Sequence, residues 1–250
     1  MTSNMPRLIR SELRKLTTTK MPVAFLCVLV VIAALNAFAV IAGTDMDGSK
    51  AFIATAADQQ SLMAFATNAF MGAGLFGAMA VAREYAHHTV VPTFLAAPRR
   101  HRAVFAQLVA VGGVGSLLSV VGAGLIVTAI ALALPTTEYG FLVSAGTVVR
   151  IVAASAFAGA AGAVLGAGIG LVVRNTGGAV TGAVLILIVG PPLVVQLASG
   201  TAPWMPGVLA NVLSGTATDV GVPSAVAALA LWACIPAAAG LVAAQRRDVI

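Results

Sequence analysis

The sequence predicts an all-α, polytopic membrane protein with six transmembrane helices, and three observations support this fold class. The chain is 60% hydrophobic and 9% charged, with a mean hydropathy of +1.01. A soluble domain of 250 residues buries only roughly 70–75% of its unfolded surface, which is too little to hide so many apolar side chains. Long continuous stretches contain no Asp, Glu, Lys, Arg or His, which favours helices over the alternating strands of a barrel. They are residues 21–44, 59–82, 103–137, 151–173, 175–218 and 220–245.

An amphipathic helix is expected first, over residues 1–20. At about 100° per residue, Leu8, Ile9, Leu13 and Leu16 share one face of the helix, and arginines occupy the other. Such a helix lies along the inner membrane surface as an interfacial helix before the first span. The alternative is the basic region of a cleaved signal peptide. It is disfavoured because the apolar run that follows reaches full span length.

The spans follow as parts of a single transmembrane domain that covers residues 1–250. A helix needs about 20 apolar residues to cross a bilayer. The third span is longer than that, which favours a tilted helix or an interfacial end. The expected spans are residues 22–42, 62–82, 104–134, 148–173, 178–198 and 223–245.

The fifth span has an irregular outer end. Gly190-Pro191-Pro192 interrupts its apolar run, and Pro203, Trp204 and Pro206 follow. Proline disrupts regular helix, and Trp is typical of the membrane interface. We therefore expect residues 199–222 to form an outer re-entrant or short-helical segment instead of a simple extended loop.

Glycines recur at every fourth position of the fourth span, at Gly162, Gly166 and Gly170. Small residues at this spacing allow two helix backbones to approach closely, which is how helices associate in lipid. This stripe is expected to be a helix-packing surface.

The basic residues predict the orientation. All Lys and Arg residues except Lys50 and Arg150 lie in the N-terminal segment, in the loop 83–102, at Arg174, or at the C-terminal end. By the positive-inside rule these segments are cytoplasmic. The protein is therefore expected in the cell membrane (inner or plasma membrane), with both termini in the cytoplasm. The same rule explains the formal charge of +6. Nucleic-acid binding is not predicted, because no recognition motif accompanies the charge.

No catalytic residue, cofactor site or metal site is predicted in this chain. The pattern of Gly72 to Gly77 matches a dinucleotide fingerprint in spelling only, because it lies inside an apolar span with no preceding strand. His87, His88 and His101 are accompanied by no Cys or carboxylate set at metal-ligand spacing. The spans also contain no Ser–His–Asp set and no carboxylate pair. The chain is therefore not expected to be an enzyme.

The loop 83–102 concentrates polarity between two apolar spans. Secondary transporters usually keep ionisable residues inside their spans to bind protons or Na⁺, and the interiors of the spans predicted here contain none. If the protein transports, its energy is expected to enter from the cytoplasm. Pro92 favours a helix start and Pro98 a helix end, which predicts a short helix between them. Phe94 and Leu95 are apolar residues on this polar loop, which suggests docking to a partner. The alternative is an ordinary basic inner loop.

The loop resembles the first cytoplasmic loop of ABC transporter permeases of the type-2 exporter class. The matching residues are Glu84-Tyr85, Thr89, Leu95, Pro98 and Arg100. Ser-Glu-Leu-Arg-Lys-Leu at 11–16 likewise resembles the interfacial helix of that family. One departure is His88, which stands where a glycine usually precedes the Thr.

This resemblance implies an export permease that pairs with a second permease subunit, identical or homologous, and with two copies of a separate ATP-binding cassette subunit. ATP and Mg would bind in that partner, and no cofactor would bind in this chain. The segment 92–98 would be the coupling helix. Membrane lipids surround such a permease, and its substrates are amphipathic drugs, lipids, peptides or glycolipids. The ATPase-coupling residues would be Glu84, Tyr85, Thr89, Pro92, Phe94, Leu95, Pro98, Arg99, Arg100 and Arg102.

Two other functions stay open on the sequence. One is a secondary or facilitated transporter that works without an ATPase partner. The other is a structural or assembly subunit that does not itself transport. An ATPase partner would separate the first function from both of these.

Overall fold

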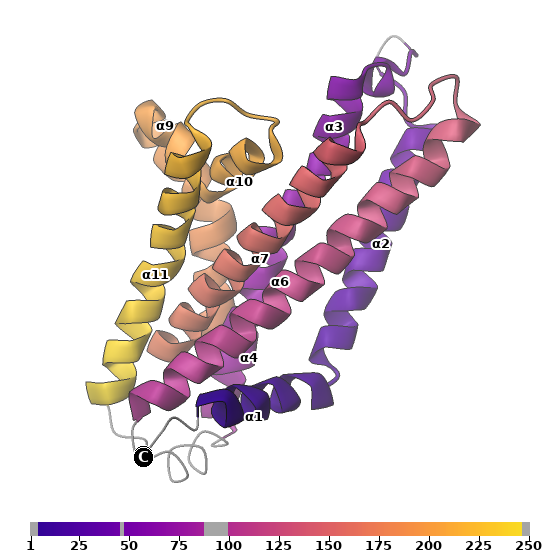
Figure 1. The fold of residues 1–250 in the computed structure, drawn as a ribbon. Helices are drawn as coiled ribbons and strands as arrows, with labels where there is room; N and C mark the ends of the chain where they lie inside the picture. Colours follow the sequence, from indigo (N-terminus) through magenta and orange to yellow (C-terminus); the bar gives the residue numbers. More distant parts are fainter. Residues whose placement is uncertain (1–4, 46–47, 88–99, 247–250) are drawn as a thin grey trace.

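The computed structural model describes residues 5–45, 48–87 and 100–246, and Figure 1 shows an elongated bundle of helices. These residues form no β-strand, and six of their helical segments are long and apolar enough to cross a membrane. The prediction of an all-α polytopic membrane protein is therefore confirmed. The candidate spans are Met21–Ala42, Ala56–Ala86, His101–Thr136, Ala145–Val173, Thr176–Leu197 and Val222–Arg246.

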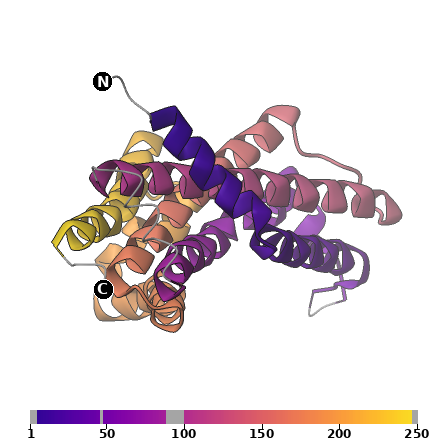
Figure 2. The same ribbon diagram turned by 90° about the horizontal axis from the view of Figure 1, so that it is seen from below.

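The first helix, α1 (Met5–Thr18), lies crosswise to the long helices, at the end of the bundle where α11 ends (Figure 1; Figure 2). A bend at residues 19–20 leads into α2 (Met21–Ala42), where Pro22 occupies the first turn. Proline is tolerated there because the first turn lacks intrahelical acceptors for its N–H groups. The start of α1 and the end of α11 thus share one end of the bundle, and the side of the membrane they face stays a prediction.

The second and third spans are longer than the bilayer requires. The second consists of α3 (Ala56–Ala64), a 3₁₀ turn η2 (Phe65–Asn68) and α4 (Ala69–Ala86), and η1 (Ala51–Ile53) precedes it. Thr55 and Asp58 form a capping box that fixes the start of α3. The third span is α6 (Arg100–Ala133), extended by η3 (Leu134–Thr136).

The fourth span, α7 (Ala145–Val173), is the centre of the bundle. It packs against α4, α6 and α11 along its length. In its most apolar stretch 67% of the residues are buried, against 11% in α2. Both helices are apolar on all sides, but α7 is rich in Gly and Ala and can be surrounded closely.

The predicted packing glycines lie against α4. A Cβ atom at Gly170 would be 2.9 Å from the backbone oxygen of Ala78, and one at Gly166 would overlap the oxygen of Gly74. A Cβ atom at Gly162 would likewise overlap the backbone oxygen of Phe70. The contact positions advance together along both helices, so α4 and α7 run parallel. Their backbones approach as closely as small residues in lipid allow.

The fifth span is irregular where the sequence predicted. It begins as α8 (Thr176–Val184), passes through a π-helical turn (Leu185–Val189) and ends as α9 (Gly190–Leu197). The π turn absorbs the disruption that Pro191 and Pro192 introduce, since proline has no N–H to donate. The helix therefore continues beyond the prolines and does not end at them.

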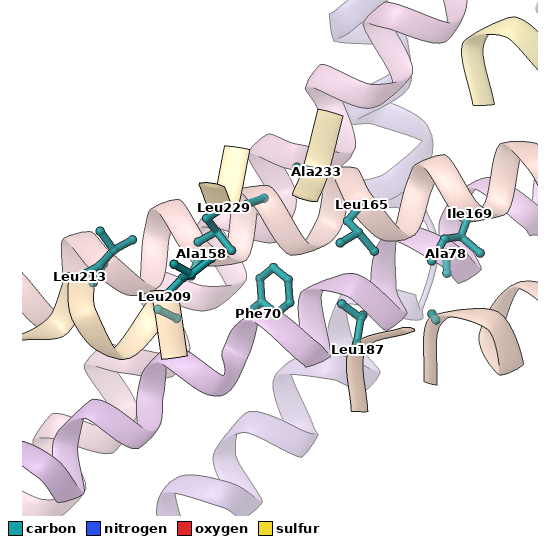
Figure 3. Close-up of a cluster of buried hydrophobic side chains, with 14 of the residues drawn as sticks. Phe70, Ala78, Ala158, Leu165, Ile169, Leu187, Leu209, Leu213, Leu229 and Ala233 are labelled. Carbon is teal, nitrogen blue, oxygen red and sulfur yellow. The ribbon is translucent and has the colours of Figure 1, made fainter. Parts of the chain in front are cut away.

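The segment 199–222 contains η5 (Ser199–Trp204) and a short helix, α10 (Pro206–Ser214), before α11 (Val222–Arg246). Helix α10 packs against α7 and α11, and it buries Leu209 and Leu213. Figure 3 shows these two side chains in one apolar cluster with Phe70 of α4, Leu165 of α7 and Leu229 of α11. The segment thus returns into the bundle as a packed element.

Candidate functional site

The end of α4 carries the described part of the predicted coupling loop. Glu84 and Tyr85 lie in the last turn of α4, Arg100 begins α6, and the partly buried Arg102 follows. The structure therefore places both flanks of the loop at the end of the bundle that α1 crosses (Figure 1). The other predicted coupling residues lie outside the described residues, and they are Thr89, Pro92, Phe94, Leu95, Pro98 and Arg99.

Glu84 belongs to a charged cluster that joins α4 to α1. The Lys15 Nζ lies 2.7 Å from Glu12 Oε1 and 3.3 Å from Glu84 Oε2. The side chains of Glu12 and Glu84 are only 5% and 14% exposed, whereas Lys15 is 36% exposed. The Gln107 side chain of α6 donates a further hydrogen bond to Glu84. Two mostly buried carboxylates therefore share one ammonium, and three helices meet at that point.

Tyr85 makes the second connection, to α7 and α11. The Arg174 guanidinium lies 5.0 Å from the centre of the Tyr85 ring, within the range of a cation–π interaction. Arg174 also donates from Nη2 to the backbone oxygen of Ala243 in α11, at 3.0 Å. It occupies the left-handed region at φ 57°, directly after the last turn of α7. That conformation is uncommon for a residue other than glycine, and here it turns the chain while the side chain bridges two helices.

The interfacial helix α1 packs through its apolar face against the residues around Tyr85. Leu16 is buried with Tyr85 and Leu108 in one core cluster, and Leu8 and Ile9 are partly buried. Leu13 is 36% exposed and remains available to lipid. The opposite face of α1 carries exposed arginines. The amphipathic arrangement expected from the sequence is therefore present.

An apolar pocket of about 370 Å³ lies between α2, the junction of η2 with α4, and α6. Phe25 and Val28 of α2, Gly72 of α4 and Leu118 of α6 contribute to its walls. Its volume falls within the range of about 300–1,000 Å³ that is usual for small-molecule sites. The pocket is separate from the charged cluster of Lys15, Glu12 and Glu84.

The opposite end of the bundle is held by polar contacts. Arg150 of α7 donates from Nε to the Leu213 oxygen at 2.9 Å and from Nη2 to the Val212 oxygen at 3.1 Å. These carbonyls lie in the last turn of α10, where the Val212 oxygen also accepts from the Gly215 N–H at 3.1 Å. Gln59 of α3 likewise donates to Gly140, at 2.9 Å. These contacts fix α10 and the connection between α6 and α7 to the helices at this end of the bundle.

Sequence reasoning identified Glu84 and Tyr85 but missed their partners. In the sequence, Lys15 contributes to the orientation signal and to the motif at 11–16, Arg174 contributes only to the orientation signal, and Gln107 has no predicted role. Two positions in the sequence indicate such partners. Arg174 stands alone between two long apolar runs, and Gln107 lies about one helical turn into the predicted third span. Isolated polar residues at such positions usually have a partner. Among the described residues no group of three or more His, Cys, Asp or Glu could hold a metal ion.

Neither a protein-family model nor a curated protein sequence matches this chain.

Proposed function

We propose that this chain is the membrane-spanning permease subunit of an ATP-driven ABC exporter. It would form the translocation path for an amphipathic substrate and couple to a separate ATPase subunit through loop 83–102. Its partners would be two ATP-binding cassette subunits, which bind ATP and Mg, and a second permease subunit, in a homodimer or a heterodimer. The complex would reside in the cell membrane with both termini in the cytoplasm.

The observation that carries the proposal is the set of contacts at the base of the loop. The last turn of α4 is joined to α1 and α6 through Glu84, and to α7 and α11 through Tyr85 and Arg174. A push on a segment anchored there would reach five helices at once. Closely packed helices transmit such a displacement because they do not deform continuously.

The distribution of charge supports an external energy source. Every Asp, Glu, Lys or Arg within the six candidate spans lies in the first or last two turns of its helical segment. The interiors of the spans therefore contain no carboxylate that could bind a proton or Na⁺ during a transport cycle. The second candidate function, a secondary or facilitated transporter without an ATPase partner, lacks such a residue.

The proposal is tested by isolating the full-length chain from its native membrane after mild cross-linking. We expect an ATPase with a phosphate-binding loop to co-purify with the wild type. The variant Leu95→Asp should lose it, because a carboxylate would be buried in the apolar contact. A matched control is Leu142→Asp, since Leu142 is 51% exposed in a loop at the other end of the bundle. Retention of the ATPase by Leu95→Asp, or its absence from the wild type, would refute the proposal.

A further inference from the structure

The pocket between α2, η2–α4 and α6 is almost entirely apolar. Among the described residues that line it, Asn68 and Ser119 are the only ones with polar side chains. The lining residues come from the middle turns of the third span and from the first half of the first. The pocket therefore lies at the depth of the lipid hydrocarbon, where water is scarce.

The occupant must match this environment. An empty space of about 370 Å³ deprives its lining of dispersion contacts, so a ligand that fills it is favoured. A polar or charged ligand would leave its hydrogen-bonding groups without partners against this wall, and each such group costs several kcal/mol in hydrocarbon. A hydrocarbon chain has no such groups. The surrounding bilayer supplies chains of this kind directly.

Helix α2, which forms one wall of the pocket, has few buried residues. Along α2 only Met21, Ala33 and Val40 are buried. Near the pocket α2 is fixed to the bundle by the edge-to-face pair of Phe25 and Phe76, whose ring centres are 5.4 Å apart. A wall with few buried contacts can move aside at small cost, which gives a chain a lateral route from the bilayer.

One polar side chain marks a place for a polar atom of the ligand. Asn68 lines the pocket, its side chain caps no helix, and its amide can donate to a carbonyl or hydroxyl oxygen. Ser119 also lines the pocket, but its hydroxyl packs against Gly159 of α7. An apolar space with one donor at its wall fits an acyl chain with its carbonyl.

We propose that this pocket binds one acyl chain of an amphipathic lipid-like molecule that enters sideways between α2 and α4. The pocket would hold the apolar part of the exporter's cargo, so its role in transport rests on the proposed function. Binding itself requires neither ATP nor a partner. A binding measurement on the purified chain therefore fails or succeeds independently of the ATPase experiment.

The variant Gly72→Leu is designed to fill the pocket without disturbing the fold. Gly72 lines the pocket, and a Cβ atom added there would meet nothing within 4 Å. Gly113→Leu is the matched control, because a Cβ atom there also meets nothing within 4 Å and Gly113 does not line the pocket. Both changes put the same side chain at an open position within a span. Equal thermal unfolding of the two variants would show that both are folded.

The probe is palmitic acid that carries a photoactivatable diazirine, added in increasing mole fraction to the chain in lipid nanodiscs. We expect labelling of the residues around Leu118 and Ser119 to saturate, while exposed Leu132 on α6 and Val149 on α7, which do not line the pocket, are labelled in linear proportion to the probe. Gly72→Leu should lower the saturable labelling by about tenfold, because its side chain occupies the space of the ligand. Gly113→Leu should leave it unchanged. Linear labelling at Leu118 and Ser119, or saturable labelling that survives in Gly72→Leu, would overturn the proposal.

Discussion

The charged cluster of Lys15, Glu12 and Glu84 predicts a measurable energetic link between α1 and the second span. At 3.3 Å and an effective dielectric of about 20, the attraction of Lys15 for Glu84 is about 5 kcal/mol. Desolvation of the ions offsets much of this. Exposed pairs contribute about 0.2–1 kcal/mol, and breaking a fully buried pair costs about 3–5 kcal/mol. Since Lys15 is 36% and Glu84 14% exposed, we expect a net coupling of about 1–2 kcal/mol.

The experiment is a double-mutant cycle with Lys15→Met and Glu84→Gln. Lys15→Met should be the more destabilising single change, because it removes the ammonium from both Glu84 and Glu12. Glu84→Gln should cost about 1 kcal/mol, since Lys15 keeps Glu12 at 2.7 Å. The double variant should be less destabilised than the sum of the two by about 1–2 kcal/mol.

The assay is equilibrium unfolding of the reconstituted chain in an SDS titration, followed by circular dichroism. Arg14→Met provides the control, because Arg14 is exposed on the same helix and should be additive with Glu84→Gln. If Lys15→Met and Glu84→Gln are also additive within about 0.3 kcal/mol, the pair does not join α1 to α4. The last turn of α4 would then be connected to other helices through Tyr85 and Arg174 but not through the pair of Lys15 and Glu84.

Three further changes follow from the packing and are measured by the same unfolding titration. Gly166→Ala should destabilise the bundle by about 2 kcal/mol or more, because its Cβ atom would overlap the α4 backbone. The control Gly124→Ala should be neutral, because a Cβ atom there meets nothing within 4 Å. Equal effects of the two changes would contradict the close packing of α4 and α7. Arg150→Leu should cost about 1–3 kcal/mol, because it deprives the Leu213 carbonyl of its donor and leaves the Val212 carbonyl with the Gly215 N–H alone; a loss below about 0.5 kcal/mol would show that these bonds contribute little. Tyr85→Leu should cost about 1 kcal/mol more in the wild type than in Arg174→Gln, because the buried ring loses the same apolar packing in both; an equal cost in both would exclude the cation–π contact.

The sequence was sufficient for the fold class because lipid imposes a simple rule on every span. Runs without charge must be helical and must reach about 20 residues, so the positions of Lys20, Arg83 and Arg174 nearly define the ends of three spans. The glycine stripe of the fourth span was also readable, since four-residue spacing of small side chains has one main use in a membrane.

The arrangement of the helices was not readable from the same signals. The distribution of apolar residues around each helix does not place α7 at the centre and α2 at the edge, because both are apolar on all sides. The pair of Lys15 and Glu84 is separated by 69 residues, and only the packing of α1 brings it together. The π turn before Gly190 was missed because proline usually predicts the end of a helix, and in lipid a local rearrangement can satisfy the freed carbonyls instead.

The most direct test of the central claim is cross-linking from position 95 in the native membrane. A chain with Cys27 and Cys234 changed to serine and Leu95 changed to cysteine would be treated with a short thiol-reactive photo-cross-linker, and the linked protein identified by mass spectrometry. If an ATPase drives this permease through loop 83–102, the product is an ATP-binding subunit on the cytoplasmic face. If position 95 of the folded chain links to no ATP-hydrolysing protein, the proposed coupling is wrong.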